Sequence, residues 1–264
     1  MVRQSLLKCA VLLVVGFTSC RTKEPDVGSA RPVAARPKPL PQLERMVAGP
    51  DAGADGDSLF SVVRLPPEGP ALPSGATVVV LDGERATVDG RPFVSPGPQG
   101  PLVLRPTPET YLAQVAGLLT ALDDASAEVW LAHPEAPIAF RLALKDERAF
   151  QEWLDEPVAG KVRVIHRADG FEVSTNMGKL PGGDPNGPTV PLRGGQLDLE
   201  MLQRGLGRVH HRFPDAGDVC FVPSFGMELS KTAEAMAADF PRADAPIFPV
   251  TCLVYPRPVG DGGR

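Results

Sequence analysis

Lys161–Ser174 reads KVRVIHRADGFEVS, two runs rich in β-branched and aromatic residues on either side of an Asp-Gly pair at 169–170. Such a pair between such runs predicts a β-hairpin, because glycine readily takes the positive φ that a tight turn requires. The stretch Thr77–Asp89, TVVVLDGERATVD, has the same construction about the Asp-Gly pair at 82–83. The chain is therefore expected to contain two hairpins of one kind.

An amphipathic helix is expected after each hairpin, beyond a connection rich in proline and glycine. Thr107, with Pro108 at the first helical position, predicts the N-cap of the first helix, and Asp198 predicts the N-cap of the second. Apolar residues recur at helical spacing in both segments. They are Leu112, Val115, Leu119 and Leu122 in the first, and Leu199, Leu202, Leu206, Val209 and Phe213 in the second.

A strand is expected after each helix, over 128–132 and 218–222, at nearly the same distance from the two caps. This recurrence predicts an α+β protein of two small tandem β-β-α-β units, each with a mixed sheet and helices on one face. The two units then diverge. The first continues with a strand at 138–144 and a short helix at 147–154, and the second with a helix at 228–240 and a strand at 248–255.

The N-terminus has the pattern of an export signal. Arg3 and Lys8 precede the apolar run Cys9–Phe17, which is long enough for a signal peptide and too short to span a bilayer. The run ends in Phe-Thr-Ser-Cys at 17–20, and this resembles the lipobox of bacterial lipoproteins. An uncleaved anchor or an ordinary secretory signal is the alternative interpretation.

The lipobox resemblance implies that residues 1–19 are removed and that Cys20 is acylated. The chain would then be held in the cell envelope by lipid, facing the periplasm. Arg21, where an aspartate is associated with inner-membrane retention in some bacteria, slightly favours the outer membrane.

Residues 20–75 are dominated by proline, alanine, glycine and charge, which predicts a disordered tether. The island at 59–65, LFSVVRL, interrupts this composition and is expected to be an extra edge strand or a docking segment. The expected organisation is a signal peptide (1–19), the lipidated tether (20–75), a first domain (76–157), a second domain (158–256) and a disordered tail (257–264).

The composition argues against nucleic acid as a partner, since a net charge of −5 and a pI near 5.5 give no basic surface for phosphates. Of the four cysteines, Cys9 would leave with the signal peptide and Cys20 would carry lipid. Cys220 and Cys252 remain, and an oxidising compartment would allow them to pair if their strands were neighbours. Two buried free thiols are the alternative.

No constellation in the sequence predicts catalysis, a cofactor or a bound metal. His210 and His211 are adjacent on a helix and point about 100° apart, so they do not form a chelating pair. Ser224 lacks the glycines of a nucleophile turn. The glycine-rich segment 177–195 is expected to be a loop, and its candidate binding residues are Lys179, Asp184, Asn186 and Arg193.

Residues 161–255 resemble the periplasmic domain of the ExbD/TolR biopolymer-transport family. The resemblance rests on VRVIHRADGFEV, the glycine-rich connection, DLEMLQRGLGRVHHRFPD, DVCFVPS and IFPVTCLVYP. The first unit resembles the family more weakly, through VVVLDGERATVDGRPF and its helix. In that family a transmembrane aspartate couples proton flow to motion, and no residue of this chain matches it.

The resemblance implies a non-enzymatic binding or scaffold component of a transport or motility assembly, with envelope proteins or the cell wall as partners. Exposed strand edges would also allow a homodimer. A solute-binding lipoprotein, with a ligand pocket between the two domains, is the alternative function. A purely structural spacer is a third.

Overall fold

The computed structural model describes residues 67–94, 100–224 and 226–258. The expected signal peptide, Cys20 and the island at 59–65 lie outside the described residues. Contacts divide the chain at residue 60, and all described residues belong to the unit 61–264. Both predicted domains therefore lie within a single unit.

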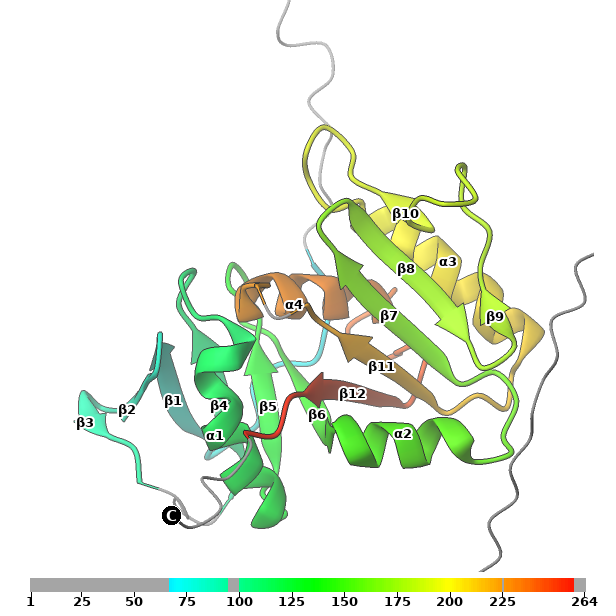
Figure 1. The fold of residues 1–264 in the computed structure, drawn as a ribbon. Helices are drawn as coiled ribbons and strands as arrows, with labels where there is room; N and C mark the ends of the chain where they lie inside the picture. The colour runs from blue at the N-terminus through cyan, green and yellow to red at the C-terminus, as the bar shows by residue number, and fades with distance from the viewer. Residues whose placement is uncertain (1–66, 95–99, 225, 259–264) are drawn as a thin grey trace, which may run out of the picture. The chain divides into compact units, whose positions relative to one another are not determined.

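Twelve strands form one mixed sheet in the described part (Figure 1). The first seven are β1 (Thr77–Asp82), β2 (Arg85–Val88), β3 (Arg91–Pro92), β4 (Leu102–Pro106), β5 (Val129–Ala132), β6 (Ala139–Asp146) and β7 (Val162–Arg167). The others are β8 (Gly170–Thr175), β9 (Gly178–Lys179), β10 (Val190–Pro191), β11 (Asp218–Val222) and β12 (Val250–Tyr255). The helices are α1 (Leu112–Asp124), α2 (Glu147–Asp155), α3 (Leu199–Arg212), α4 (Leu229–Met236) and the short 3₁₀ helix η1 (Ala237–Asp239). The α+β class is confirmed.

The sheet runs through both halves of the chain, in the order β10-β8-β7-β11-β12-β6-β5-β4-β1-β2-β3, with β9 beside β8. The sequence predicts two sheets, and the structure joins them because β12 pairs in parallel with β6 as well as with β11. The last strand of the chain thus lies between the two halves, which share one sheet.

The sequence predicts helices on one face of each sheet. In the structure the helices cover both faces. Side chains of α1, α3 and α4 join one core cluster with strand residues such as Val219 and Phe221. Trp153 of α2 belongs to another cluster, with Cys220, Cys252 and Val254. Because successive strand residues point to opposite faces, α2 covers the face opposite to the other helices. Figure 1 shows α3 behind β8.

Cys220 and Cys252 form a disulfide. They are directly opposite each other in the parallel pair β11–β12, with Cα atoms 4.4 Å apart. Both are fully buried, and Trp153 packs on them while its indole Nε1 donates to Asp218 at 2.9 Å. The sequence left pairing and two free thiols open, and only the neighbouring positions of β11 and β12 decide between them.

The two halves differ in topology. In the second half β11 pairs directly with β7, whereas in the first half β4 lies between β1 and β5 and pairs in parallel with both. The sequence places an irregular connection where β4 is found. Leu102, Val103 and Leu104 are all buried, since β4 is covered on both faces, and such a strand has no alternation to reveal it.

The hairpin predicted over Lys161–Ser174 is present as β7 and β8. Gly170 in its turn has a φ of 139°, and a Cβ there would lie 2.1 Å from the carbonyl oxygen of Val190. Only glycine fits, because β10 crosses close to the turn and pairs with the start of β8.

The predicted cap of the first helix is wrong. α1 begins at Leu112, and Gln114 accepts the N–H of Tyr111 at 2.9 Å. Thr110 is fully buried, and its hydroxyl donates to the carbonyl of Leu81 at 2.9 Å. Leu229 at the start of α4 also donates its N–H to the Thr110 carbonyl at 2.8 Å. Tertiary contacts therefore fix the segment that leads into α1. The predicted cap of α3 is confirmed: Asp198 accepts the N–H of Met201 at 2.9 Å.

The boundaries of the folded part lie further out than expected. Residues 67–75, assigned to the tether, pack on the sheet: Ala139 donates its N–H to the Pro70 carbonyl at 3.0 Å, and Leu72 packs in a small cluster. Arg257, assigned to the tail, forms ion pairs with Asp124 at 2.7 Å and Asp146 at 2.8 Å. In the described part of the chain, no helix combines the length and apolar character needed to cross a membrane.

We expect the Cys220→Ala/Cys252→Ala variant to lose about 4 kcal/mol of unfolding free energy, because the bond closes a loop with a sequence separation of 32. Urea unfolding of the oxidised wild type and the variant measures the difference. Mild reductant should leave the folded wild type unchanged, because the bond is buried under Trp153. Equal midpoints for the two proteins would contradict the expectation.

Candidate functional site

The β7–β8–β9 surface, on the face of the sheet opposite to α3, is charged. Along β7 three buried residues, Val162, Val164 and His166, alternate with three partly exposed ones, Arg163, Ile165 and Arg167. Arg163 donates Nε to the hydroxyl of Ser174 on β8 at 3.1 Å. Because alternate residues leave the core, the strand pattern itself places these cations on the outer face.

Two cations of this surface, Arg167 and Lys179, meet at Glu172. Its carboxylate lies 3.4 Å from Nη1 of Arg167 and 3.9 Å from Nζ of Lys179. Arg167 also pairs with Asp169 at 2.9 Å, and this hydrogen bond raises the pKa of Arg167 above its ordinary value. Partly exposed ion pairs of this kind add little to stability.

Three of the four residues predicted for a binding loop lie together. Lys179 Nζ donates to the carbonyl of Gly187, whose own N–H donates to the Asp184 carbonyl at 3.2 Å. The Asp184 carboxylate accepts the N–H of Asn186 at 2.9 Å. Arg193 lies beyond β10, in a separate turn that its backbone closes with Gln196. The loop therefore folds onto the charged surface through Lys179, and Arg193 belongs to the approach to α3.

The sequence missed Arg163, Arg167 and Glu172 as members of this site. The alternation within the predicted hairpin could have revealed them, since they occupy the positions between the apolar residues. It also missed Lys161, which is 5% exposed. Its Nζ donates to the Trp153 carbonyl and to Glu156 at 2.8 Å, so it fixes the end of α2 to β7.

Two histidines lie in the core, beside α4. His133 is 7% exposed, and burial lowers its pKa although Glu234 acts in the opposite direction. His166 is 6% exposed, with its ring 4.7 Å from that of Phe171. Burial lowers the pKa of His166 to about 4, and Lys231 of α4 contributes to the shift. Its Nδ1 has no hydrogen-bond partner among the described residues. His166 is therefore neutral near pH 7.

Asp239 is a fully buried carboxylate. It accepts the N–H of Phe248 at 3.1 Å and the hydroxyl of Thr251 at 3.5 Å, which connects η1 to β12. Burial raises its pKa to about 7, against the smaller effect of these hydrogen bonds. In the described residues no three side chains of the histidine, cysteine or carboxylate type come together to hold a metal ion.

Comparison with known proteins gives no assignment: no protein-family model, no curated protein and no solved structure matches this chain.

His166 and Asp239 change the stability in opposite directions with pH. The folded pKa of His166, about 4, lies below its ordinary 6.5, so its contribution is present above pH 6.5 and lost as the pH falls toward 4. The folded pKa of Asp239, about 7, lies above its ordinary 3.8, so its contribution is present below pH 3.8 and lost as the pH rises toward 7.

We expect His166→Gln to gain stability relative to the wild type as the pH falls from 6.5 to 4, and Asp239→Asn to gain it as the pH rises from 4 to 7. Each gain should reach on the order of 3 to 4 kcal/mol, because neither replacement titrates. Thermal unfolding across this range measures both, with the exposed His211→Gln as a control that follows the wild type. Parallel curves for Asp239→Asn and wild type would exclude the buried charge as the cause.

Proposed function

We propose that the chain is a lipid-anchored, non-enzymatic protein of the cell envelope that binds or scaffolds partners in a transport or motility assembly, as ExbD/TolR-like proteins do. The anchor would be Cys20, and the described unit would face the periplasm. The main support is the order of elements from β7 to β12: a hairpin, a long loop, a capped helix, a strand, a short helix and a closing strand. The resemblance rests on this order.

We further propose that the two halves are diverged copies of a β-β-α-β unit. The first half contains β1, β2, α1 and β5, and the second contains β7, β8, α3 and β11, in the same sequence order. The main difference between them is β4, which separates β1 from β5 in the sheet, and the short strands β3, β9 and β10 also differ. In this interpretation β4 was gained within the connection between hairpin and helix in the first copy.

The β7–β8–β9 surface and its loop are the favoured partner surface. The outermost strands of the sheet, β3 and β10, are two residues long. Short edge strands limit edge-to-edge pairing with a second copy. A different partner that binds the charged surface is therefore favoured over a homodimer.

The alternative function, a solute-binding protein, requires a ligand pocket between the two halves. Two hollows among the described residues lie along α3 and beneath α4, both in the second half. Neither supports that alternative.

If Cys20 carries the lipid, radioactive palmitate should label the wild-type protein in cells, and Cys20→Ala should lose the label and keep its signal peptide. Cys9→Ala is the matched control, since Cys9 would leave with residues 1–19, and it should be labelled normally. An intact, unmodified N-terminus in the mass spectrum of the native protein would overturn the anchor.

Crosslinking in intact cells should join the wild-type protein to envelope proteins or to the cell wall. Arg167→Glu/Lys179→Glu should reduce this capture several-fold, because it reverses both cations beside Glu172. Arg148→Glu, on exposed α2, is the matched control and should leave capture unchanged. Mass spectrometry identifies the products. If the wild-type protein is crosslinked to neither an envelope protein nor the cell wall, the result counts against the proposed role.

A further inference from the structure

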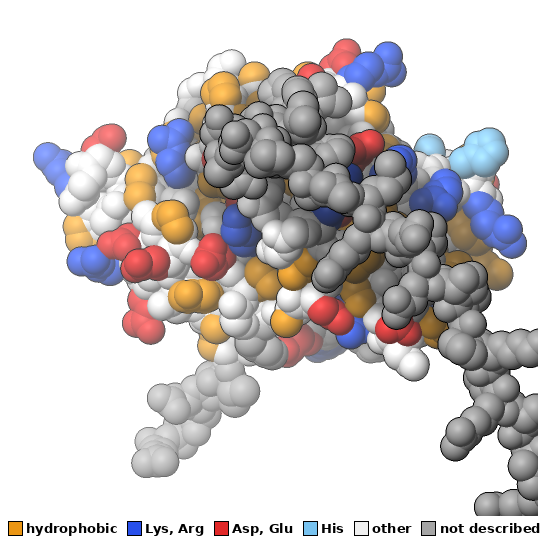
Figure 2. Space-filling model, turned by 90° about the horizontal axis from the view of Figure 1, so that it is seen from above, with side chains coloured by type: hydrophobic (Ala, Val, Ile, Leu, Met, Phe, Trp, Pro, Cys, Tyr) orange, Lys and Arg blue, Asp and Glu red, His pale blue; other side chains and the backbone are white. Residues whose placement is uncertain are grey.

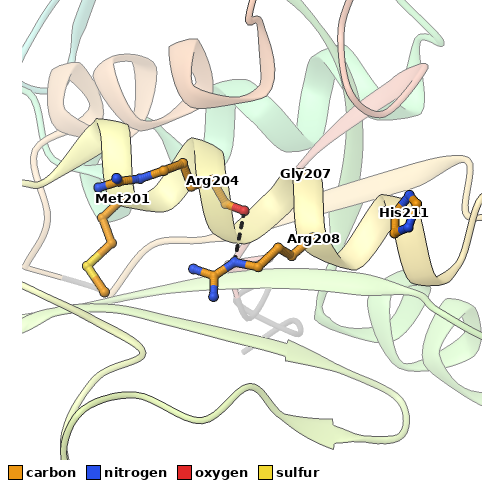
Figure 3. Close-up of a pocket in the computed structure, with 5 residues that line it drawn as sticks. All are labelled: Met201, Arg204, Gly207, Arg208 and His211. Atoms are coloured by element: carbon orange, nitrogen blue, oxygen red, sulfur yellow. Dashed lines mark hydrogen bonds between the residues drawn. The ribbon is translucent and has the colours of Figure 1, made fainter.

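The outward face of α3 is hollow. Met201, Arg204, Gly207, Arg208 and His211 recur at helical spacing and line a hollow of about 680 Å³ (Figure 3). The other face of the helix carries buried leucine and valine side chains into the core. Since a helix rises 1.5 Å per residue, the hollow extends about 15 Å along its axis.

The hollow is positively charged. Arg204 lies 3.8 Å from Glu200, and both side chains are more than half exposed, so the pair is weak. Arg208 donates Nε to the Arg204 carbonyl at 3.4 Å, and no described carboxylate forms an ion pair with it. Seen from above, Lys or Arg side chains gather beside histidine at one edge of the view (Figure 2). This sign is opposite to the net charge of −5.

Gly207 lies in the middle of the hollow. Glycine is, after proline, the least favourable residue in a helix interior. No contact within the described chain requires it, because a Cβ at Gly207 would meet nothing within 4 Å. The residue therefore weakens α3 and leaves the helix backbone open to approach from outside.

We propose that the outward face of α3 binds an acidic peptide segment of a partner protein, lying lengthwise in the hollow. Carboxylates of the segment would pair with Arg204 and Arg208, and its main chain would pass over Gly207. The apolar Met201 borders one end of the hollow and His211 the other. This surface is separate from the charged face of β7 and β8.

A peptide fits this face better than a membrane surface does. A flat bilayer would touch only the long side chains that border the hollow and would gain nothing from the missing side chain at Gly207. A chain of about the length of the hollow would gain close contact there. Guanidinium groups also match the geometry of carboxylates, with paired donors for paired acceptors.

The test uses the full chain in uncharged detergent and a fluorescein-labelled peptide that repeats aspartate between alanine and glycine. Fluorescence anisotropy should show saturable binding that weakens with added salt. The same peptide with asparagine in place of aspartate should not bind. Vesicles of phosphatidylcholine and phosphatidylglycerol form a further arm.

Arg204→Glu/Arg208→Glu should weaken peptide binding by about tenfold or more, since it reverses both charges. Arg148→Glu on α2 is the control for an exposed arginine and should bind normally. Gly207→Leu should fold with an unchanged or raised Tm and lose binding, because its side chain fills the hollow. Gly205→Ala, a buried glycine two positions earlier, should raise the Tm and bind normally.

The Gly207→Leu result separates a binding role from a structural one, since its folding is measured in the same sample. Binding that survives in Gly207→Leu, equal binding of the asparagine peptide, or binding to anionic vesicles alone would overturn the proposal. The palmitate and crosslinking experiments test the proposed function independently of this result.

Discussion

The pairing of β12 with both β11 and β6 is the constraint on which the structure depends. Residues 251–255 are all buried, and both hydrogen-bonding edges of the strand are occupied. The disulfide holds β12 to β11, and beyond the strand Arg257 reaches Asp124 at the end of α1. Without β12 the sheet would separate into two pieces with open edges. The halves therefore cannot be treated as two independent domains, whatever their origin.

Because β12 joins the two halves, it also determines which surfaces remain in contact with solvent. α1, α3 and α4 contribute to one core cluster, and α2 covers the disulfide on the opposite face. The outer residues of β7 and β8 and the outward side of α3 remain in contact with solvent. Both carry arginine, at Arg163 and Arg167 on the sheet and at Arg204 and Arg208 on the helix. Both outer surfaces therefore present charged side chains, and the two proposed binding surfaces rest on them.

Local patterns predicted most of the elements. The hairpin around 169–170, the cap at Asp198 and the strand at 218–222 lie where the sequence places them, because turn geometry and the alternation of apolar residues act over a few residues. The same patterns failed at β4, which is buried on both faces, and at Thr107, where contacts of Thr110 override a favourable cap. In the site, the loop residues Lys179, Asp184 and Asn186 were predicted, whereas the outward arginines of β7 were not.

The sequence by itself determined the class of fold and the order of the main helices and strands other than β4, since these follow from periodicity and turn chemistry within short segments. Only the tertiary structure decided which strands are neighbours. That choice joined the two halves through β12, brought Cys220 beside Cys252 and buried Asp239 behind the last strand. The physical reason is that strand pairing and burial are set by the total apolar surface removed from water, and residues far apart in the chain contribute to it together.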